Sequence, residues 1–124
     1  MPIPMAHIKH FCRHIFRGLA HLHAEKISHR DLKPENILIK LATAPPFREN
    51  LLAAEVKIAD FGAAKVLKPG GLNTPYVVSR YYRAPELIMG SRNYDCSIDV
   101  WSAGCILFEL VTRTPLFPGD AEGL

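Results

Sequence analysis

Three short motifs, in a fixed order along the chain, constrain this sequence more than its composition does. The first, His-Arg-Asp-Leu-Lys-Pro-Glu-Asn, occupies residues 29–36, Asp-Phe-Gly follows at 60–62, and Ala-Pro-Glu follows at 84–86. A single short motif often arises by chance and is weak evidence. Three motifs in one order are much harder to obtain by chance, so we expect the fold to bring them into one site.

A long amphipathic helix is predicted near the start of the chain. Over residues 6–25 the apolar side chains recur at helical spacing, which predicts a helix with one buried face. Lys9, Arg13 and Arg17 fall mostly on the opposite, solvent-facing side. Gly18 lowers helix propensity at its position, so we expect it to mark a close packing contact.

A second helix is predicted over residues 97–112, and it is apolar on nearly every side. Asp95 or Ser97 suits its N-terminal cap, and Pro115 suits its end. A helix with no clear polar face is normally buried in the middle of a core. We therefore expect this helix to need packing partners on every side, and the chain to be poorly soluble without them.

Short strands are predicted between the two helices. Residues 37–39 and 56–59 are short apolar runs beside turn residues, which predicts the two strands of a hairpin. The connection at 41–55 contains two consecutive prolines and is interpreted as a surface loop. Residues 66–78 have the glycine, asparagine and proline content of a second loop. The pattern predicts a mainly α-helical chain with short β-hairpins.

The three motifs resemble the catalytic loop, the magnesium-binding loop and the end of the activation segment of protein kinases. The resemblance runs from about Ala6 to the last residue. It implies one partial protein kinase domain over residues 1–124, which is the C-terminal lobe of the α+β kinase-like fold with the small lobe missing. Kinases usually close the hairpin with few residues, so 41–55 would carry an insertion of about ten residues.

The resemblance implies phosphoryl transfer from ATP and assigns that chemistry to four residues. Asp31 would be the base that accepts the proton of the substrate hydroxyl, and Lys33 would contact the transferred phosphate of ATP as a positive charge. Asn36 and Asp60 would supply oxygen ligands to Mg²⁺. A lysine at position 33 is similar to serine/threonine kinases, so the substrates would be serine or threonine residues of proteins.

Two acidic residues match structural positions of kinases. Asp99, near the start of the apolar helix, matches a residue that hydrogen-bonds the catalytic-loop backbone. A carboxylate buried there without such a partner would be costly. Glu86 matches a residue that pairs with an arginine further along the chain, and this sequence contains no such arginine in the expected place.

The segments around the motifs indicate a branch of the kinases. Residues 74–86 are similar to the CMGC group, which includes the cyclin-dependent and mitogen-activated kinases. Residues 63–65, 97–105 and 117–120 are most similar to the shaggy-like enzymes, which are the glycogen synthase kinase-3 type. The alternative remains open, because residues 74–76 also resemble the dual-phosphorylation motif of Jun N-terminal kinases.

The shaggy-like resemblance implies recognition of a phosphate on the substrate. These kinases prefer substrates that are already phosphorylated nearby, and they bind that phosphate with a basic cluster. Arg30 and Lys65 match two positions of the cluster, and the third basic residue would lie in the small lobe. The alternative is that Arg30 and Lys65 only neutralise charge in the activation segment.

The resemblance also implies regulation by phosphorylation. Tyr76 matches the activating phosphotyrosine of the family, and Thr74 is a second candidate. A phosphate on Tyr76 adds nearly two negative charges, which Arg80 and Arg83 could pair. Phosphorylation at Tyr76 is therefore expected to order the activation segment and to open the groove for the substrate.

Several parts of a complete kinase are missing from the sequence. No glycine-rich loop and no strand lysine of the kinase type precede Asp31, although both normally hold ATP. We therefore expect a fragment that is inactive by itself. One alternative is a non-catalytic fragment that binds substrates or a scaffold, and an incomplete gene model is equally consistent with the sequence.

The histidines and cysteines suggest a weaker alternative. His10 and His14 lie one helical turn apart, which is a spacing that can hold a metal ion. A solvated, histidine-rich helix face is the simpler interpretation. Cys12, Cys96 and Cys105 have no metal-binding spacing and are expected to be free thiols in a reducing compartment.

Charge and hydropathy bear on the class of partner. The net charge of +3 is too small and too dispersed to indicate a nucleic-acid partner. The start of the chain lacks the apolar core of a signal peptide, and the longest apolar run is too short to span a membrane. We expect an intracellular protein, cytoplasmic and also nuclear, with ATP and protein substrates as its partners and no membrane.

Overall fold

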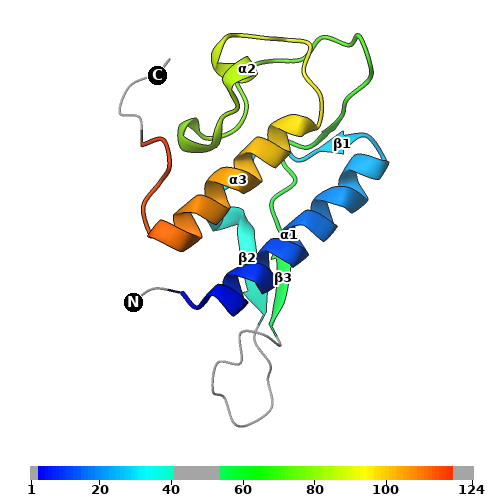
Figure 1. Cartoon of the computed structure of the whole chain (residues 1–124). Helices are drawn as coiled ribbons and strands as arrows, with labels where there is room; N and C mark the ends of the chain where they lie inside the picture. The colour runs from blue at the N-terminus through cyan, green and yellow to red at the C-terminus, as the bar shows by residue number, and fades with distance from the viewer. Residues whose placement is uncertain (1–2, 41–53, 119–124) are drawn as a thin grey trace.

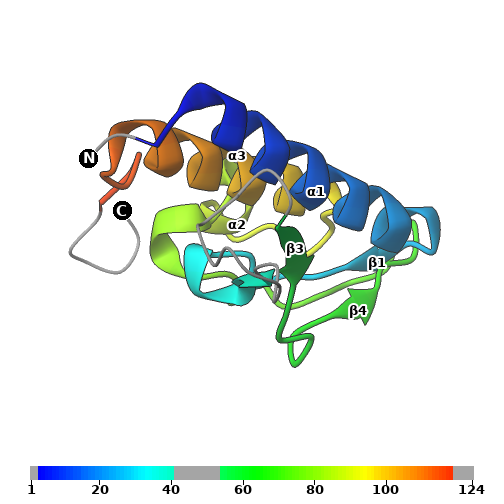
Figure 2. The same ribbon diagram turned by 90° about the horizontal axis from the view of Figure 1, so that it is seen from below.

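Two helices form the centre of the molecule. The computed structural model describes residues 3–40 and 54–118. Helix α1 (Met5–Ala24) and helix α3 (Ser97–Thr112) lie side by side and antiparallel, and the short strands lie on one side of this pair (Figures 1 and 2). The elements between them are β1 (Ile27–Ser28), η1 (Pro34–Asn36), β2 (Ile37–Lys40), β3 (Glu55–Ile58), β4 (Lys65–Val66), η3 (Arg80–Tyr82) and α2 (Pro85–Ile88), where η denotes a 3₁₀ helix.

Helix α1 confirms the predicted amphipathic pattern and begins one residue earlier than expected. Its buried face consists of Ile8, Phe11, Ile15 and Leu19. The predicted contact at Gly18 is present, because a Cβ atom there would lie 2.9 Å from Ile58 Cδ1. The missing side chain therefore lets α1 pack closely on strand β3.

Helix α3 has the predicted bounds but is not buried on every side. Ile98, Ala103 and Ile106 are buried, whereas Trp101 and Phe108 on other sides are more than one third exposed. The expectation of burial all round is thus wrong for the part of the chain that the structure describes, because α1 and η3 cover only one side of α3. A continuous apolar composition cannot tell which side of a helix is covered.

The ends of α3 differ in detail from the prediction. The Asp95 carboxylate accepts a hydrogen bond from the Ser97 N–H at 2.8 Å. Hydrogen bonds from the hydroxyl and backbone N–H of Ser97 lower the pKa of Asp95. The helix ends where Arg113 adopts a left-handed conformation with φ of 64°, before Pro115 is reached. The prediction of Asp95 or Ser97 as the N-cap is therefore wrong, because Cys96 occupies that position, although the Asp95 side chain accepts one N–H of the first turn.

Two small antiparallel sheets complete the fold. Strands β2 and β3 form the predicted hairpin, with Ile37 opposite Ile58 and Lys40 opposite Glu55. Strands β1 and β4 pair through Ile27–Ser28 and Lys65–Val66, and this sheet was not predicted. Most of the predicted insertion at 41–55 lies outside the described residues. No helix within 3–40 and 54–118 is long and apolar enough to cross a membrane.

The burial of Cys105 leads to a prediction about thiol reactivity. The residue is 2% exposed, and burial raises the pKa of its thiol, so little of the reactive thiolate forms near neutral pH. Iodoacetamide at about pH 8 should modify the partly exposed Cys12 of the folded chain and spare Cys105. Mass spectrometry of tryptic peptides measures both, and alkylation in urea is the control. Equal native labelling of the two thiols would contradict the described core.

Candidate active site

The buried carboxylate of Asp99 holds the backbone of the first motif. Asp99 is 0% exposed. Its Oδ2 accepts the His29 N–H at 2.8 Å and the Ser28 hydroxyl at 3.1 Å, and its Oδ1 accepts the Arg30 N–H at 3.0 Å. His23 Nε2 lies 2.8 Å from Oδ2. The predicted contact with the backbone of residues 29 and 30 is therefore present, and polar partners replace water around this buried carboxylate.

The same contact stabilises an unusual backbone conformation. Arg30 has φ of 67°, which is the left-handed region that residues with a side chain rarely adopt. The hydrogen bond from its N–H to Asp99 keeps the peptide in that orientation. The chain reverses at this point, so Asp31 follows on the open side of the loop and remains about one quarter exposed.

His29 connects the first motif to the second. Its Nδ1 accepts the Asp31 N–H at 3.1 Å, and its Nε2 lies 2.8 Å from the Ala59 carbonyl oxygen. The neutral imidazole with its proton on Nε2 satisfies both partners, because Nδ1 must accept and Nε2 must donate. The Phe61 ring packs edge-on against His29 with ring centroids 5.2 Å apart. The two motifs therefore meet in one place.

Asp31, Lys33 and Asn36 form a small polar group. The Asn36 amide nitrogen donates to the Asp31 carbonyl oxygen at 2.8 Å and lies 3.4 Å from the Asp31 carboxylate. Lys33 Nζ lies 3.9 Å from Asp31 Oδ1. Asn36 is buried, whereas Asp31 and Lys33 are partly exposed. The carboxylate thus lies at the surface with one positive charge and one amide beside it.

The hairpin brings Asp60 to the same end as Asn36. The Ala59 N–H donates to the Asn36 carbonyl oxygen at 2.8 Å, immediately beyond the pair Ile37 and Ile58. Asp60 follows with φ of 60°, and its Oδ1 accepts the Gly62 N–H at 3.2 Å. Its side chain is exposed, so one carboxylate oxygen of Asp60 remains open to solvent.

Within the described residues, no hydrogen bond joins Tyr76 to Arg80 or Arg83. Tyr76 is 86% exposed, and its backbone N–H donates to the Thr74 hydroxyl at 3.1 Å. Arg83 instead donates through Nη2 to the Val78 carbonyl oxygen at 3.0 Å. Val78 itself has φ of 67°, which is strained for a β-branched residue. Arg83 therefore supports the backbone of a strained segment.

The other predicted basic and acidic residues have separate surroundings. Arg30 Nε donates to the Ala63 carbonyl oxygen at 2.7 Å, and Lys65 Nζ donates to Asn73 Oδ1 at 2.5 Å. Arg80 is partly exposed at the start of η3. Glu86 lines a largely apolar groove of about 700 Å³ and makes no ion pair within residues 3–40 and 54–118.

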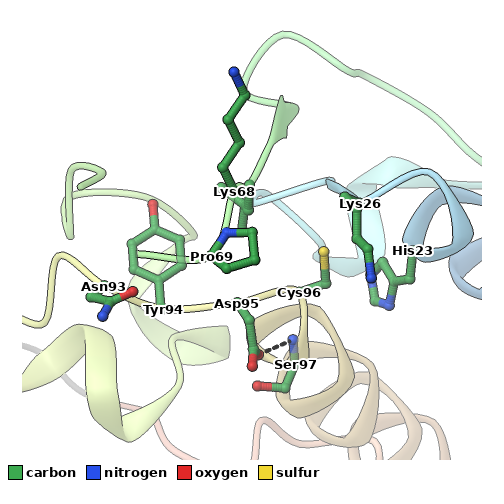
Figure 3. Close-up of a pocket in the computed structure, with 10 residues that line it drawn as sticks. His23, Lys26, Lys68, Pro69, Asn93, Tyr94, Asp95, Cys96 and Ser97 are labelled. Carbon is green, nitrogen blue, oxygen red and sulfur yellow. Dashed lines mark hydrogen bonds between the residues drawn. The ribbon is translucent and has the colours of Figure 1, made fainter. Parts of the chain in front are cut away.

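A further cavity of about 470 Å³ was not anticipated from the motifs (Figure 3). It lies between the end of α1 and the start of α3 and is lined by no residue of the three motifs. Cys96 borders it, and burial raises the pKa of this thiol, as it does for Cys105. Tyr94 also lines it, and its hydroxyl points away from Asp95 and Ser97 in Figure 3.

The histidines of α1 have structural contacts that sequence reasoning missed. His10 Nε2 lies 2.7 Å from the Ala54 carbonyl oxygen, and His14 Nδ1 accepts the Val56 N–H at 3.1 Å. Both side chains therefore join α1 to strand β3 instead of facing only solvent. Across the described residues, no group of three His, Cys, Asp or Glu side chains could hold a metal ion.

Comparison with known families agrees with this geometry. The family model of the protein kinase domain matches residues 1–123. The chain therefore belongs to the protein kinase family, which is a family of phosphotransferases. Within that family, the described part of this chain has three α-helices and two small antiparallel sheets.

The dependence of the loop on Asp99 gives a stability prediction. Asp99→Asn places an NH₂ group against backbone N–H donors, and removing one partner of a buried charge network costs about 3 kcal/mol or more. The control Asp95→Asn affects an exposed carboxylate and should cost about 1 kcal/mol at most. Urea unfolding followed by circular dichroism measures both. Equal losses of unfolding free energy for the two variants would show that Asp99 does not stabilise the loop at residues 29–36.

Proposed function

We propose that this chain is the catalytic part of a serine/threonine protein kinase of the CMGC group, most similar to the shaggy-like enzymes. The parent reaction is transfer of the γ-phosphoryl group of ATP to serine or threonine residues of proteins. The observation that carries the proposal is the Asp31 carboxylate, with Lys33 Nζ at 3.9 Å and the Asn36 amide at 3.4 Å, beside the hairpin end that bears Asp60. Catalysis of phosphoryl transfer consists mainly of such positioning and charge placement.

Asp31 acts on the substrate hydroxyl. Its partly exposed carboxylate accepts the hydroxyl hydrogen and orients the oxygen for in-line attack. It takes the proton as the oxygen bonds to the γ-phosphorus and the bond from that phosphorus to the bridging oxygen breaks, which releases ADP. Lys33 places a positive charge beside the same position. His29 keeps Asp31 in place, because its Nδ1 accepts the Asp31 N–H. General-base help of this kind is worth about 10²–10⁴ in rate.

The donor set fits a magnesium ion. The Asn36 amide nitrogen is bonded to Asp31, which leaves the amide oxygen as its free ligand. Asp60 has a carboxylate oxygen open to solvent at the same end of the hairpin. Mg²⁺ prefers such oxygen ligands and, when bound, neutralises charge on the phosphates of ATP. We propose Asn36 and Asp60 as the residues that hold it.

A second candidate function is a binding module without catalysis. The apolar groove beside Glu86 and the exposed Trp101 and Phe108 of α3 support it, because a large exposed apolar surface typically marks a protein contact. The sequence also contains no glycine-rich loop for ATP phosphates. In this function the groove would hold a substrate or scaffold protein without modifying it.

Exchange of Asp31 separates the two candidate functions. In a full-length kinase that combines this chain with a glycine-rich small lobe, Asp31→Asn should lower transfer of radiolabelled phosphate from ATP to a serine peptide by about 10²–10⁴-fold, because the general base is lost. Asp95→Asn is the matched control and should leave the rate unchanged. Equal rates for Asp31→Asn and the wild type would refute the catalytic role. No transfer by the wild type, with peptide binding retained, would favour the binding module.

We also propose that phosphorylation of Tyr76 activates the enzyme. The side chain is 86% exposed and therefore accessible to a kinase, and the phosphate would draw Arg80 and the free donors of Arg83 towards it. Tyr76→Phe should remove the activation, and Arg80→Gln should weaken it in the phosphorylated protein. Peptide phosphorylation rates before and after treatment with a tyrosine phosphatase measure the effect. Equal rates for Tyr76→Phe and the phosphorylated wild type would exclude this regulation.

A further inference from the structure

Asn73 lies between two cations, one on strand β4 and one on the loop that follows α2. Lys65 Nζ donates to Asn73 Oδ1 at 2.5 Å, and Arg92 Nε donates to the Asn73 carbonyl oxygen at 3.4 Å. Asn73 is 4% exposed and uncharged. It therefore brings Lys65 and Arg92 to one place without compensating either charge.

The backbone of Arg92 is fixed by the same residue. The Asn73 N–H donates to the Arg92 carbonyl oxygen at 2.7 Å. Just before it, Gly90 with φ of 83° reverses the chain after α2, and the Ser91 N–H donates to the Glu86 carbonyl oxygen at 2.9 Å. These bonds fix the backbone of Arg92, so its side chain begins at a defined place, while Arg92 itself remains exposed.

Arg30 joins the same network through Tyr94. Its Nη1 donates to the Tyr94 hydroxyl at 3.1 Å, and that hydroxyl donates to the Thr74 carbonyl oxygen at 2.7 Å. Thr74 follows Asn73 directly, so all three cations border the segment 73–74. This segment immediately precedes the exposed Tyr76.

The positive charge of this group is not balanced by an acid. Within the described residues, the side chains of Arg30, Lys65 and Arg92 donate to carbonyl, amide and hydroxyl oxygens, and none of these acceptors is a carboxylate. Only Nε of Arg92 is engaged, and 3.4 Å is long for a hydrogen bond. Its remaining N–H donors can therefore turn to an anion at little cost.

We infer that Arg92 is the third cation of a phosphate-binding cluster with Arg30 and Lys65. This inference rests on the proposed kinase function and its preference for phosphorylated substrates. The ligand is a phosphate monoester, which comes either from a phosphorylated substrate or from Thr74 of the same segment. The cluster then needs no basic residue from outside the described part of the chain.

Binding of a phosphoserine peptide to the 124-residue chain tests the role of Arg92. Fluorescence anisotropy at low salt compares this peptide with its unphosphorylated form. The wild type should bind the phosphorylated peptide more tightly than the unphosphorylated one. Arg92→Ala should reduce this ratio of affinities about tenfold, which is the typical effect of removing one charge-assisted hydrogen bond. Arg92→Lys should lose less, and Arg13→Ala, which removes an exposed arginine of α1, should lose nothing.

A second arm identifies the source of the phosphate. The chain is assembled with Thr74 in phosphorylated form, and its phosphate is titrated by ³¹P NMR. If Thr74 is the source, the cluster lowers the pKa of that phosphate, Arg92→Ala reverses the shift, and peptide binding is blocked. An unshifted phosphate, together with peptide binding that depends on Arg92, assigns the site to substrates.

Two results would overturn the inference in distinguishable ways. If Lys65→Ala loses the preference for the phosphopeptide while Arg92→Ala keeps it, Arg92 has no role and the proposed recognition of phosphorylated substrates stands. If the wild type recognises phosphate in neither arm, that recognition fails and the inference fails with it.

Discussion

One carboxylate connects the parts of this small structure that carry its chemistry. Asp99 belongs to the central helix α3, yet its two carboxylate oxygens accept hydrogen bonds from residues that lie 69 to 76 positions earlier in the sequence. These residues are His23, Ser28, His29 and Arg30. Burying a charge is unfavourable unless polar partners replace water, so this arrangement persists only if the loop keeps its shape. The position of Asp31 therefore depends on a fully buried residue of another element.

His29 and the β2–β3 hairpin connect Asp99 to the second motif, Asp-Phe-Gly at 60–62. The imidazole contacts the backbone on both sides, at Asp31 and Ala59, and the hairpin register places Asp60 beside Asn36. Each of these connections is a directional hydrogen bond between partly or fully buried groups, and leaving such a group without its partner is costly. Residues that are about thirty positions apart in the sequence thus become neighbours.

Sequence reasoning predicted the local elements well and the long-range contacts poorly. The bounds of α1, α3 and the hairpin follow from periodicity. The first two motifs meet as predicted, whereas Glu86 of the third motif lines a separate groove. Strands β1 and β4 have two residues each, too few to show any periodicity. The pairing of His23 with Asp99 joins positions 76 residues apart, and the position of Arg92 depends on a loop contact with Asn73. No local pattern contains such information.

The two ends of the β2–β3 hairpin lie beside different parts of the chain. Its pair Ile37 and Ile58 lies next to Asn36 and Asp60, whereas its pair Lys40 and Glu55 lies at the other end. The chain therefore leaves and re-enters the hairpin at the end opposite Asn36 and Asp60, where the connection 41–54 attaches. A connection of a different length can join the strands there while the register that places Asp60 beside Asn36 stays constant.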